Sequence, residues 1–159
     1  MKIVAFSDSH GDFTALERIY KAQPRAECYI HLGDGLAEAL ALRERHPEMP
    51  LVPLKGNCDY RAKDAADTKL LEPQEGLRVL CTHGHRFHVK HGLGVLIEAA
   101  EGMGVSAVLF GHTHEPFCRR IGDIWFVNPG RASGWDGLYF ATLDFEKGVL
   151  IPNLARIEA

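Results

Sequence analysis

Residues 2–10 read KIVAFSDSH, an apolar run that leads directly into two serines, an aspartate and a histidine. The run from Lys2 to Phe6 resembles a β-strand, and Ser7 and Asp8 close it. Polar side chains at the end of such a strand lie where a parallel sheet places its ligands. Asp8 and His10 are two residues apart, so both can turn toward the same side. This stretch therefore predicts a strand and the beginning of a site.

Four later segments also place metal-ligand side chains beside a glycine, and most of them follow an apolar run. They are Gly33-Asp34, Gly56-Asn57-Cys58-Asp59, His83-Gly84-His85 and Gly111-His112-Thr113-His114. Seven side chains of this set would be enough for two cations that share one carboxylate: Asp8, His10, Asp34, Asn57, His83, His112 and His114. Oxygen and imidazole donors without a thiolate are typical of a hydrolase site for hard or borderline metals.

The first third of the chain predicts alternating strands and helices. Strands are expected at residues 2–6, 28–32 and 51–54. The first helix is expected to begin near Thr14, because Thr14 and Glu17 have the spacing of a capping box, and to end before Pro24. The second is expected at residues 36–45. Connections of this length favour parallel pairing of the three strands.

Pro53 lies inside the third expected strand, although proline has no N–H to donate to a β-ladder. A bulge is one explanation. The other is a position where the missing N–H would face no neighbouring strand.

The second half of the chain is richer in hairpins, with one helix expected at residues 93–103 and one further strand at 107–110. Pairs of strands are expected around three turns, at residues 68–71 and 77–82, 117–121 and 124–127, and 138–145 and 149–157. A parallel half followed by a hairpin-rich half suggests two stacked mixed sheets with helices outside. Without a linker or repeat, residues 1–159 are expected to form a single domain.

Composition narrows the function classes. A chain of 159 residues can bury roughly 70% of its unfolded surface, so its core needs no disulfide. The formal charge of −3 argues against a general nucleic-acid binder. No apolar run approaches the ~20 residues that span a membrane, and Asp8 comes too early for a signal peptide. Four scattered cysteines without a C-x-x-C pair fit a reducing cytoplasm, which is the expected location.

The expected chemistry follows from the donor set. Asp34 is the natural bridge between two cations, because a carboxylate has two oxygens and a charge. Asn57 offers an amide oxygen, which binds a metal without adding charge. Two cations ~3.5–4 Å apart can clamp a phosphate and lower the pKa of a bridging water toward about 7, which supplies a hydroxide nucleophile. Such a site suits phosphate esters more than peptides.

The five motifs, in this order, resemble those of the calcineurin-like metallophosphoesterases, and most closely the small YfcE-like phosphodiesterases, which also have a cysteine after the asparagine. The resemblance spans Ile3 to Pro129. It implies a four-layer α/β/β/α sandwich of two mixed β-sheets flanked by helices, a two-metal centre often loaded with manganese, and phosphodiester hydrolysis. It also implies two ligand sets that share Asp34. One set is Asp8, His10, Asp34 and His114, and the other is Asp34, Asn57, His83 and His112.

Two positions depart from the family pattern. Cys58 stands where the phosphomonoesterase and protein-phosphatase branches have a histidine that protonates the leaving group. This difference favours substrates with good leaving groups or modest turnover, and a space-filling role for Cys58 is equally open. Ala37 stands where many relatives have an aspartate or asparagine, so a scaffold hydrogen bond made there is missing.

Other polar residues near the motifs are candidates for supporting roles. His85 and Asp59 are candidates to hydrogen-bond a ligand residue or the phosphate. Arg131, in the turn Asn128-Pro129-Gly130-Arg131, is either a phosphate contact or a solvated turn residue, and Arg86 and Lys90 are open in the same way. Four other histidines are expected to have no functional role: His31, His46, His88 and His91.

The sequence therefore predicts a metal-dependent phosphoesterase, more a phosphodiesterase than a monoesterase, in which Asp34 and Asn57 act directly. Manganese is the first expectation for both metals, with iron, nickel, cobalt or zinc as alternatives. The partner is a small phosphate ester or diester, and a homo-oligomer that uses Trp125 or Trp135 is open. One rival is a non-catalytic scaffold on the same fold, as in the retromer subunit that resembles this family. The other is a metallohydrolase that acts on a different bond, such as a thioester or lactam.

Overall fold

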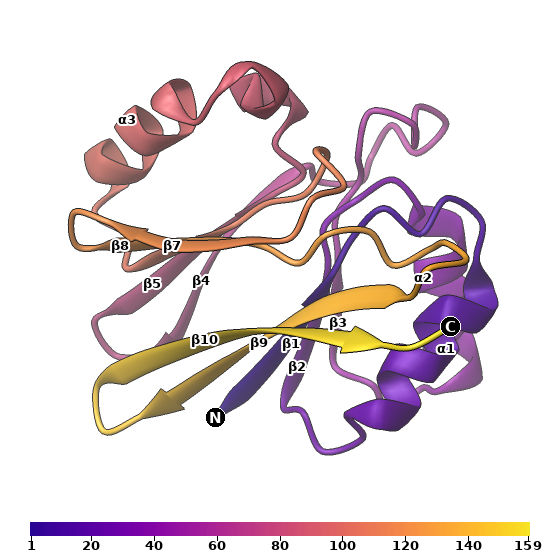
Figure 1. Ribbon diagram of the computed structural model, residues 1–159. Coiled ribbons are helices and arrows are strands. Elements are labelled where there is room, and N and C mark those ends of the chain that lie inside the picture. The colour runs from indigo at the N-terminus through magenta and orange to yellow at the C-terminus, as the bar shows by residue number, and fades with distance from the viewer.

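Strand β1 (Lys2–Phe6) lies in the middle of the first of two five-stranded sheets (Figure 1). The strand order is β10-β9-β1-β2-β3 in the computed structural model, which covers residues 1–159. Strands β1, β2 (Cys28–His31) and β3 (Leu51–Pro53) are parallel, as their long connections predict. Strands β9 (Leu138–Glu146) and β10 (Val149–Ile157) form an antiparallel hairpin. Strand β9 also pairs antiparallel with β1.

The second sheet has the order β4-β5-β6-β8-β7. Its three inner strands, β5 (Leu77–Thr82), β6 (Ala107–Leu109) and β8 (Ile124–Asn128), are parallel. Strands β4 (Thr68–Gln74) and β7 (Phe117–Ile121) pair with them antiparallel at the two edges. Both sheets are therefore mixed, as the sequence predicted.

The layers follow from the alternation of side chains along each strand. Ile3 and Ala5 face a core between the two sheets, whereas Val4 and Phe6 pack under helices α1 (Phe13–Ala22) and α2 (Leu36–Arg45). A third core lies between the second sheet and helix α3 (Gly94–Met103). Figure 1 shows α1 and α2 outside one sheet and α3 outside the other. The predicted four-layer α/β/β/α sandwich is confirmed.

The start of helix α1 differs from the prediction. Its N-cap is Asp12, whose carboxylate accepts a hydrogen bond of 2.9 Å from the Ala15 N–H, so the expected capping box at Thr14 was wrong. A tight turn brings the Asp12 N–H within 2.9 Å of the Ser9 carbonyl, and the chain therefore enters the helix earlier. Aspartate is as good an N-cap as serine and better than threonine.

Pro53 is accommodated without a bulge, because β3 is the outer strand of its sheet. The Leu54 N–H donates to the His31 carbonyl at 2.8 Å. Because the N–H groups of successive residues in a strand point to opposite sides, the backbone nitrogen of Pro53 faces away from β2. The second explanation offered from the sequence is therefore correct. Strand β4 is longer than predicted and shifts register between Leu71 and Gln74, which lets the edge strand accept Pro73.

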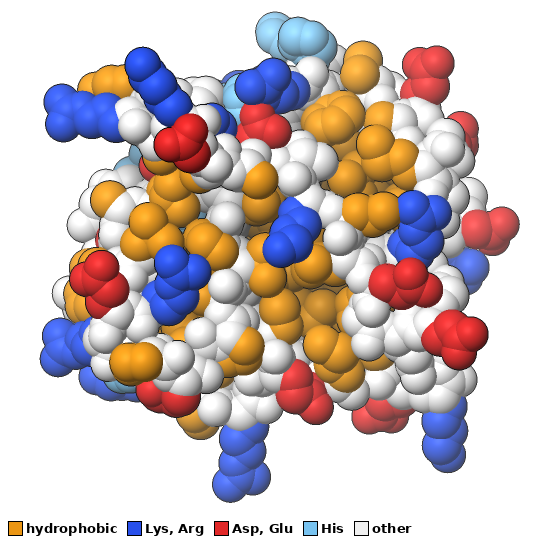
Figure 2. Space-filling model, turned by 180° about the vertical axis from the view of Figure 1, so that it is seen from behind, with side chains coloured by type: hydrophobic (Ala, Val, Ile, Leu, Met, Phe, Trp, Pro, Cys, Tyr) orange, Lys and Arg blue, Asp and Glu red, His pale blue; other side chains and the backbone are white.

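Two short 3₁₀ turns, η1 (His85–Phe87) and η2 (Val89–His91), lie in a segment where no helix was predicted. No helix of the structure combines the length and the apolar character that crossing a membrane would need. Figure 2 shows the back of the molecule, where hydrophobic side chains are interspersed with charged ones.

Candidate metal centre

The five motifs follow strands β1, β2, β3, β5 and β6, at the carboxyl ends of parallel strands from both sheets. Because the two sheets stack face to face, these ends meet at one rim of the sandwich. The structure brings all seven predicted ligand side chains together there.

The first group of donors is formed by Asp8, His10 and His114. The His114 Nε2 atom lies 3.3 Å from Asp8 Oδ1 and 3.2 Å from His10 Nε2. Asp8 is fully buried, and its Oδ2 atom accepts the His112 N–H at 3.1 Å. Its Oδ1 atom has no hydrogen-bond partner. A buried carboxylate oxygen without a partner is costly unless a cation satisfies it, so this group fits a metal.

The second group surrounds the Nε2 atom of His83. This atom lies 3.1 Å from Asn57 Oδ1, 3.2 Å from His112 Nδ1 and 3.4 Å from Asp34 Oδ2. The other ring nitrogen lies 2.8 Å from the Leu32 carbonyl, which can only accept, and this contact assigns the proton to Nδ1. Nε2 is then free as a metal donor, with its ring fixed by the backbone.

Asp34 lies between the two groups. Its Oδ2 atom is 3.4 Å from His83 Nε2 and 3.9 Å from His10 Nε2, while its Oδ1 atom accepts the Cys58 N–H at 2.8 Å. A side chain in this place can serve both groups at once. The geometry is thus compatible with the bridging position that the sequence suggested for Asp34.

The charge states suit cation binding. Burial raises the pKa of Asp34, but its hydrogen bond and charge interaction with His83 outweigh burial and bring the pKa below its ordinary value. Burial opposes the charged form of His83, yet Asp34 and Asp8 together raise its pKa. Burial, and then the nearby His83 and Lys90 charges, lower the pKa of His112 to about 4. Near neutral pH, Asp34 is ionised and His112 is uncharged, as metal ligands must be.

The backbone at this rim is strained. Five of the seven ligand-type residues have left-handed φ angles, which are rare for residues other than glycine: Asp8 (56°), His10 (44°), Asp34 (56°), His112 (71°) and His114 (64°). Such conformations cost about 1–3 kcal/mol each and cluster at functional sites. The surrounding packing is correspondingly tight, because a Cβ at Gly56 would meet Asp34 Oδ1 at 2.1 Å.

Comparison with known proteins agrees with this geometry. The model of the calcineurin-like phosphoesterase superfamily domain matches residues 1–148. The chain belongs to this superfamily. It is 34% identical over 132 residues to a probable metallophosphoesterase, YsnB, of Bacillus subtilis, covering 82% of this chain and 74% of YsnB. It is 31% identical over 157 residues to the phosphodiesterase YfcE of Escherichia coli, covering 84% and 80% of the two chains.

Solved structures show the same fold. A predicted phosphoesterase from Streptococcus pneumoniae superposes with a TM-score of 0.80 and 24% sequence identity, over 98% of this chain and 88% of that one. The family model and the two relatives confirm the predicted family resemblance, and the solved structure confirms the fold. In this calcineurin-like chain, further residues hold in place the loops that carry the donor side chains.

Asp59 ties two ligand loops together. Its carboxylate accepts backbone N–H groups from Asp34 (2.7 Å), Gly35 (3.1 Å), Leu36 (3.0 Å) and Gly56 (2.8 Å). These groups include the first N–H groups of helix α2, where a negative charge is favourable. Asp59 therefore positions the loops that carry Asp34 and Asn57.

His31 has a structural role that the sequence analysis missed. It is fully buried, and its Nδ1 atom accepts the Gly33 N–H at 3.3 Å. Its Nε2 atom lies 3.2 Å from the Ser9 hydroxyl, which donates to Glu38 at 2.8 Å. Burial lowers the pKa of His31, so the ring is neutral and its Nε2–H donates to Ser9. The available signal was a histidine inside an apolar strand, three residues before Asp34.

The turn after β8 fastens the remaining loops. The Asn128 amide donates to the Gly111 carbonyl at 3.0 Å and to the Thr113 hydroxyl at 2.9 Å. The Ser133 hydroxyl donates to the Asp8 carbonyl at 2.9 Å. These contacts hold the loops of both sheets against each other. The sequence had indicated only a turn at this position.

The candidate substrate contacts have different surroundings. The Arg131 guanidinium pairs with Asp136 at 2.6 Å, and Arg86 pairs with Asp67, so neither is a free cation in this structure. The His85 ring lies 5.3 Å from the His83 ring, and burial, followed by the His83 charge, lowers its pKa.

Cys58 lies at the edge of the centre. Its exposed sulfur lies within 4.8 Å of ligand atoms of His10 and Asp34. Burial, and then the Asp34 carboxylate, raise the pKa of the thiol, so it stays protonated near neutral pH.

Proposed function

We propose that this protein is a metal-dependent phosphoesterase that hydrolyses phosphodiesters in preference to phosphomonoesters. The observation that carries the proposal is Asp34, whose Oδ2 atom lies between the Asp8 group and the His83 group of donors. Membership in the calcineurin-like superfamily and the likeness to proteins named as phosphodiesterases support the reaction class.

Two divalent cations are proposed, with Asp34 shared. Asp8, His10 and His114 would complete one site, and Asn57, His83 and His112 the other. Manganese is proposed first because the family resemblance implies it, and iron, nickel, cobalt or zinc are alternatives, since donor type alone does not choose among these metals. When bound, such a pair supplies positive charge for the phosphate and lowers the pKa of an attacking water.

The chain's own residues position the reactants. Asp34 is held ionised between the two groups of donors, and the Asp8 carboxylate is fully buried in the first of them. Asn57 contributes an uncharged amide at the rim, where its side chain can also orient the phosphate. The protonated Cys58 thiol takes the place of a more acidic proton donor, so esters with good leaving groups are the preferred substrates.

The test is hydrolysis of bis(p-nitrophenyl) phosphate with added Mn²⁺, combined with elemental analysis of the purified protein. Asp34→Asn and His83→Ala are expected to lower kcat/KM at least about 100-fold and to reduce the bound metal, while circular dichroism keeps its native form. The matched controls are the exposed residues Asp123→Asn and His91→Ala, which are expected to retain activity.

Activity of both site variants within a few-fold of the unmodified protein would contradict the proposal. The rival of a non-catalytic scaffold predicts no gain of hydrolysis with Mn²⁺ and no loss with chelator. The rival of hydrolysis at another bond predicts turnover of a thioester or lactam in place of the phosphodiester. Cytoplasmic location and homo-oligomer formation stay predictions. Trp125 is partly buried against the core between the sheets, whereas Trp135 is 89% exposed.

A further inference from the structure

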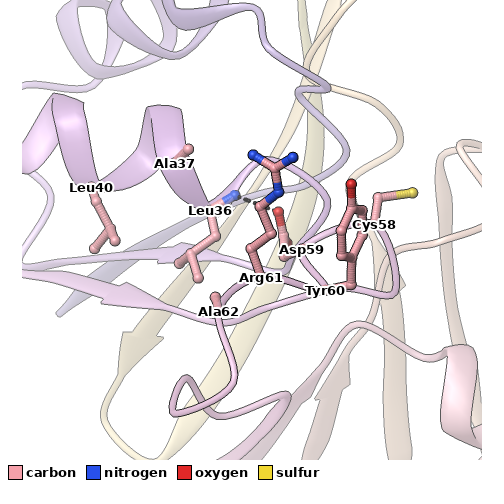
Figure 3. Close-up of a pocket in the computed structure, with 8 residues that line it drawn as sticks. All are labelled: Leu36, Ala37, Leu40, Cys58, Asp59, Tyr60, Arg61 and Ala62. Carbon is pink, nitrogen blue, oxygen red and sulfur yellow. Dashed lines mark hydrogen bonds between the residues drawn. The ribbon is translucent and has the colours of Figure 1, made fainter.

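A largely apolar groove of about 600 Å³ opens beside the metal centre (Figure 3). One wall comes from the start of helix α2, with Leu36, Ala37 and Leu40. The other comes from the segment after Asn57, with Tyr60, Arg61 and Ala62. In Figure 3, Cys58 and Tyr60 lie together at one end and Leu40 at the other. A groove of this volume is in the range that holds small organic ligands.

Cys58 connects this groove to the metal centre. It belongs to the groove wall, and its sulfur lies within 4.8 Å of ligand atoms of His10 and Asp34. An ester arm of a phosphate held by the two donor groups can therefore reach the groove past Cys58.

The wall formed by the segment after Asn57 presents two flat groups. The Tyr60 side chain is 73% exposed, and the Arg61 guanidinium lies 5.8 Å from the centre of its ring. The neighbouring Asp59 carboxylate is turned toward backbone N–H groups and does not neutralise Arg61. Aromatic and guanidinium faces stack readily on planar rings, and the leucines opposite add apolar contact.

We propose that the groove binds a planar aromatic arm of the substrate, of the size of a nucleobase, while the phosphate lies at the metal centre. The inference rests on the proposed function, because the metal centre must anchor the phosphate. The substrate class is then phosphodiesters that carry a nucleoside or a comparable aromatic group.

Ala37 offers a way to fill the groove without touching a ligand residue. It is exposed on helix α2, where leucine is a good helix former. The variant Ala37→Leu adds side-chain volume to the groove wall. The matched control is Ala22→Leu, the same exchange at an exposed helical alanine of α1 that does not line the groove.

The experiment measures binding by calorimetry to the Mn²⁺-loaded protein, with two ligands that differ only by the base: adenosine 5′-monophosphate and ribose 5-phosphate. We expect the nucleotide to bind about tenfold more tightly, since stacking on an aromatic side chain contributes on that scale. Ala37→Leu and Tyr60→Ala are expected to remove most of this advantage and to leave ribose 5-phosphate binding unchanged. Ala22→Leu is expected to keep the advantage.

Equal affinity of the unmodified protein for the two ligands would overturn the groove assignment and leave the proposed function intact. An advantage that survives in both Ala37→Leu and Tyr60→Ala would also overturn it. Absence of Mn²⁺-dependent binding for ribose 5-phosphate, together with absence of Mn²⁺-dependent hydrolysis of bis(p-nitrophenyl) phosphate, would instead remove the phosphate anchor, and the proposed function would fail with it.

Discussion

The metal centre and the groove beside it lie within a few ångströms of each other, yet they are built differently. In the centre, Asp8, Asp34 and His83 are buried and the loops are fixed by hydrogen bonds to backbone groups. In the groove, Tyr60 and Arg61 are exposed, and the Arg61 guanidinium lies 5.8 Å from the centre of the Tyr60 ring. The donor side chains are thus held by packing and hydrogen bonds, whereas the groove wall at Tyr60 and Arg61 is open to solvent.

The strongest test of this contrast is to remove the Asp59 carboxylate. Asp59→Ala would leave four N–H groups of the ligand loops and of helix α2 without their acceptor. Loss of several charge-assisted hydrogen bonds is expected to lower the free energy of unfolding by about 4 kcal/mol and kcat/KM at least about tenfold. Urea unfolding and hydrolysis assays measure both. Asp64→Asn, at an exposed site, is the control, and equal behaviour of the two variants would show that the loops hold without Asp59.

The next test uses pH, because the centre has an unusual charge distribution. In the metal-free protein the pKa of His83 is raised, so its protonated form stabilises the fold below the ordinary histidine pKa. This stabilisation is lost as pH rises through the raised pKa. With Mn²⁺ the sign reverses, because protons compete with the metal for Nε2, and stability rises with pH over the same window. Urea unfolding at several pH values, with chelator and with Mn²⁺, should give opposite slopes, and the chelator slope should weaken in His83→Ala.

A smaller effect is expected at His31, one contact further from the ligands. His31→Leu leaves the Ser9 hydroxyl and the Gly33 N–H without this partner. We expect a loss of about 2 kcal/mol in the free energy of unfolding, together with a weaker affinity for Mn²⁺. Chemical unfolding and metal titration provide the measurements. The exposed His91→Leu serves as control, and unchanged metal affinity in His31→Leu would limit His31 to a role in the core.

The smallest effect is expected at the groove. Tyr60→Ala removes a side chain that is 73% exposed, so the free energy of unfolding should change by less than about 0.5 kcal/mol. Thermal unfolding checks this value. A loss above about 2 kcal/mol would place Tyr60 in the structural framework and remove the contrast between the two regions.

Much of the fold was predictable because its signals are local. The apolar run at Lys2–Phe6 and the helix at Leu36–Arg45 were found at their observed bounds. The start of helix α1 was not, because Asp12 competes with Thr14 as the cap. The turns around His88 were missed, since a left-handed φ of 54° at a histidine has no signature in the sequence.

The candidate site also has features that were predictable from the sequence and features that were not. The seven donors and their order are visible in the sequence because His, Asp and Asn beside glycine at strand ends form a pattern that chance rarely produces. Asp59 was visible as a candidate, but its four backbone partners were not. His31 was set aside, because burial and hydrogen bonds to Gly33 and Ser9 exist only after β2 has packed between β1 and β3.

Local sequence was enough to identify most strands and helices and the side chains that can bind a metal, because residue type and hydrophobic periodicity act over a few neighbouring residues. Folding in three dimensions was needed to bring side-chain atoms of Asp8 and His114, 106 residues apart, to 3.3 Å from each other and to open a groove at Cys58. The order of strands in two sheets and the contacts between their loops set these distances. Both depend on residues far apart in the chain.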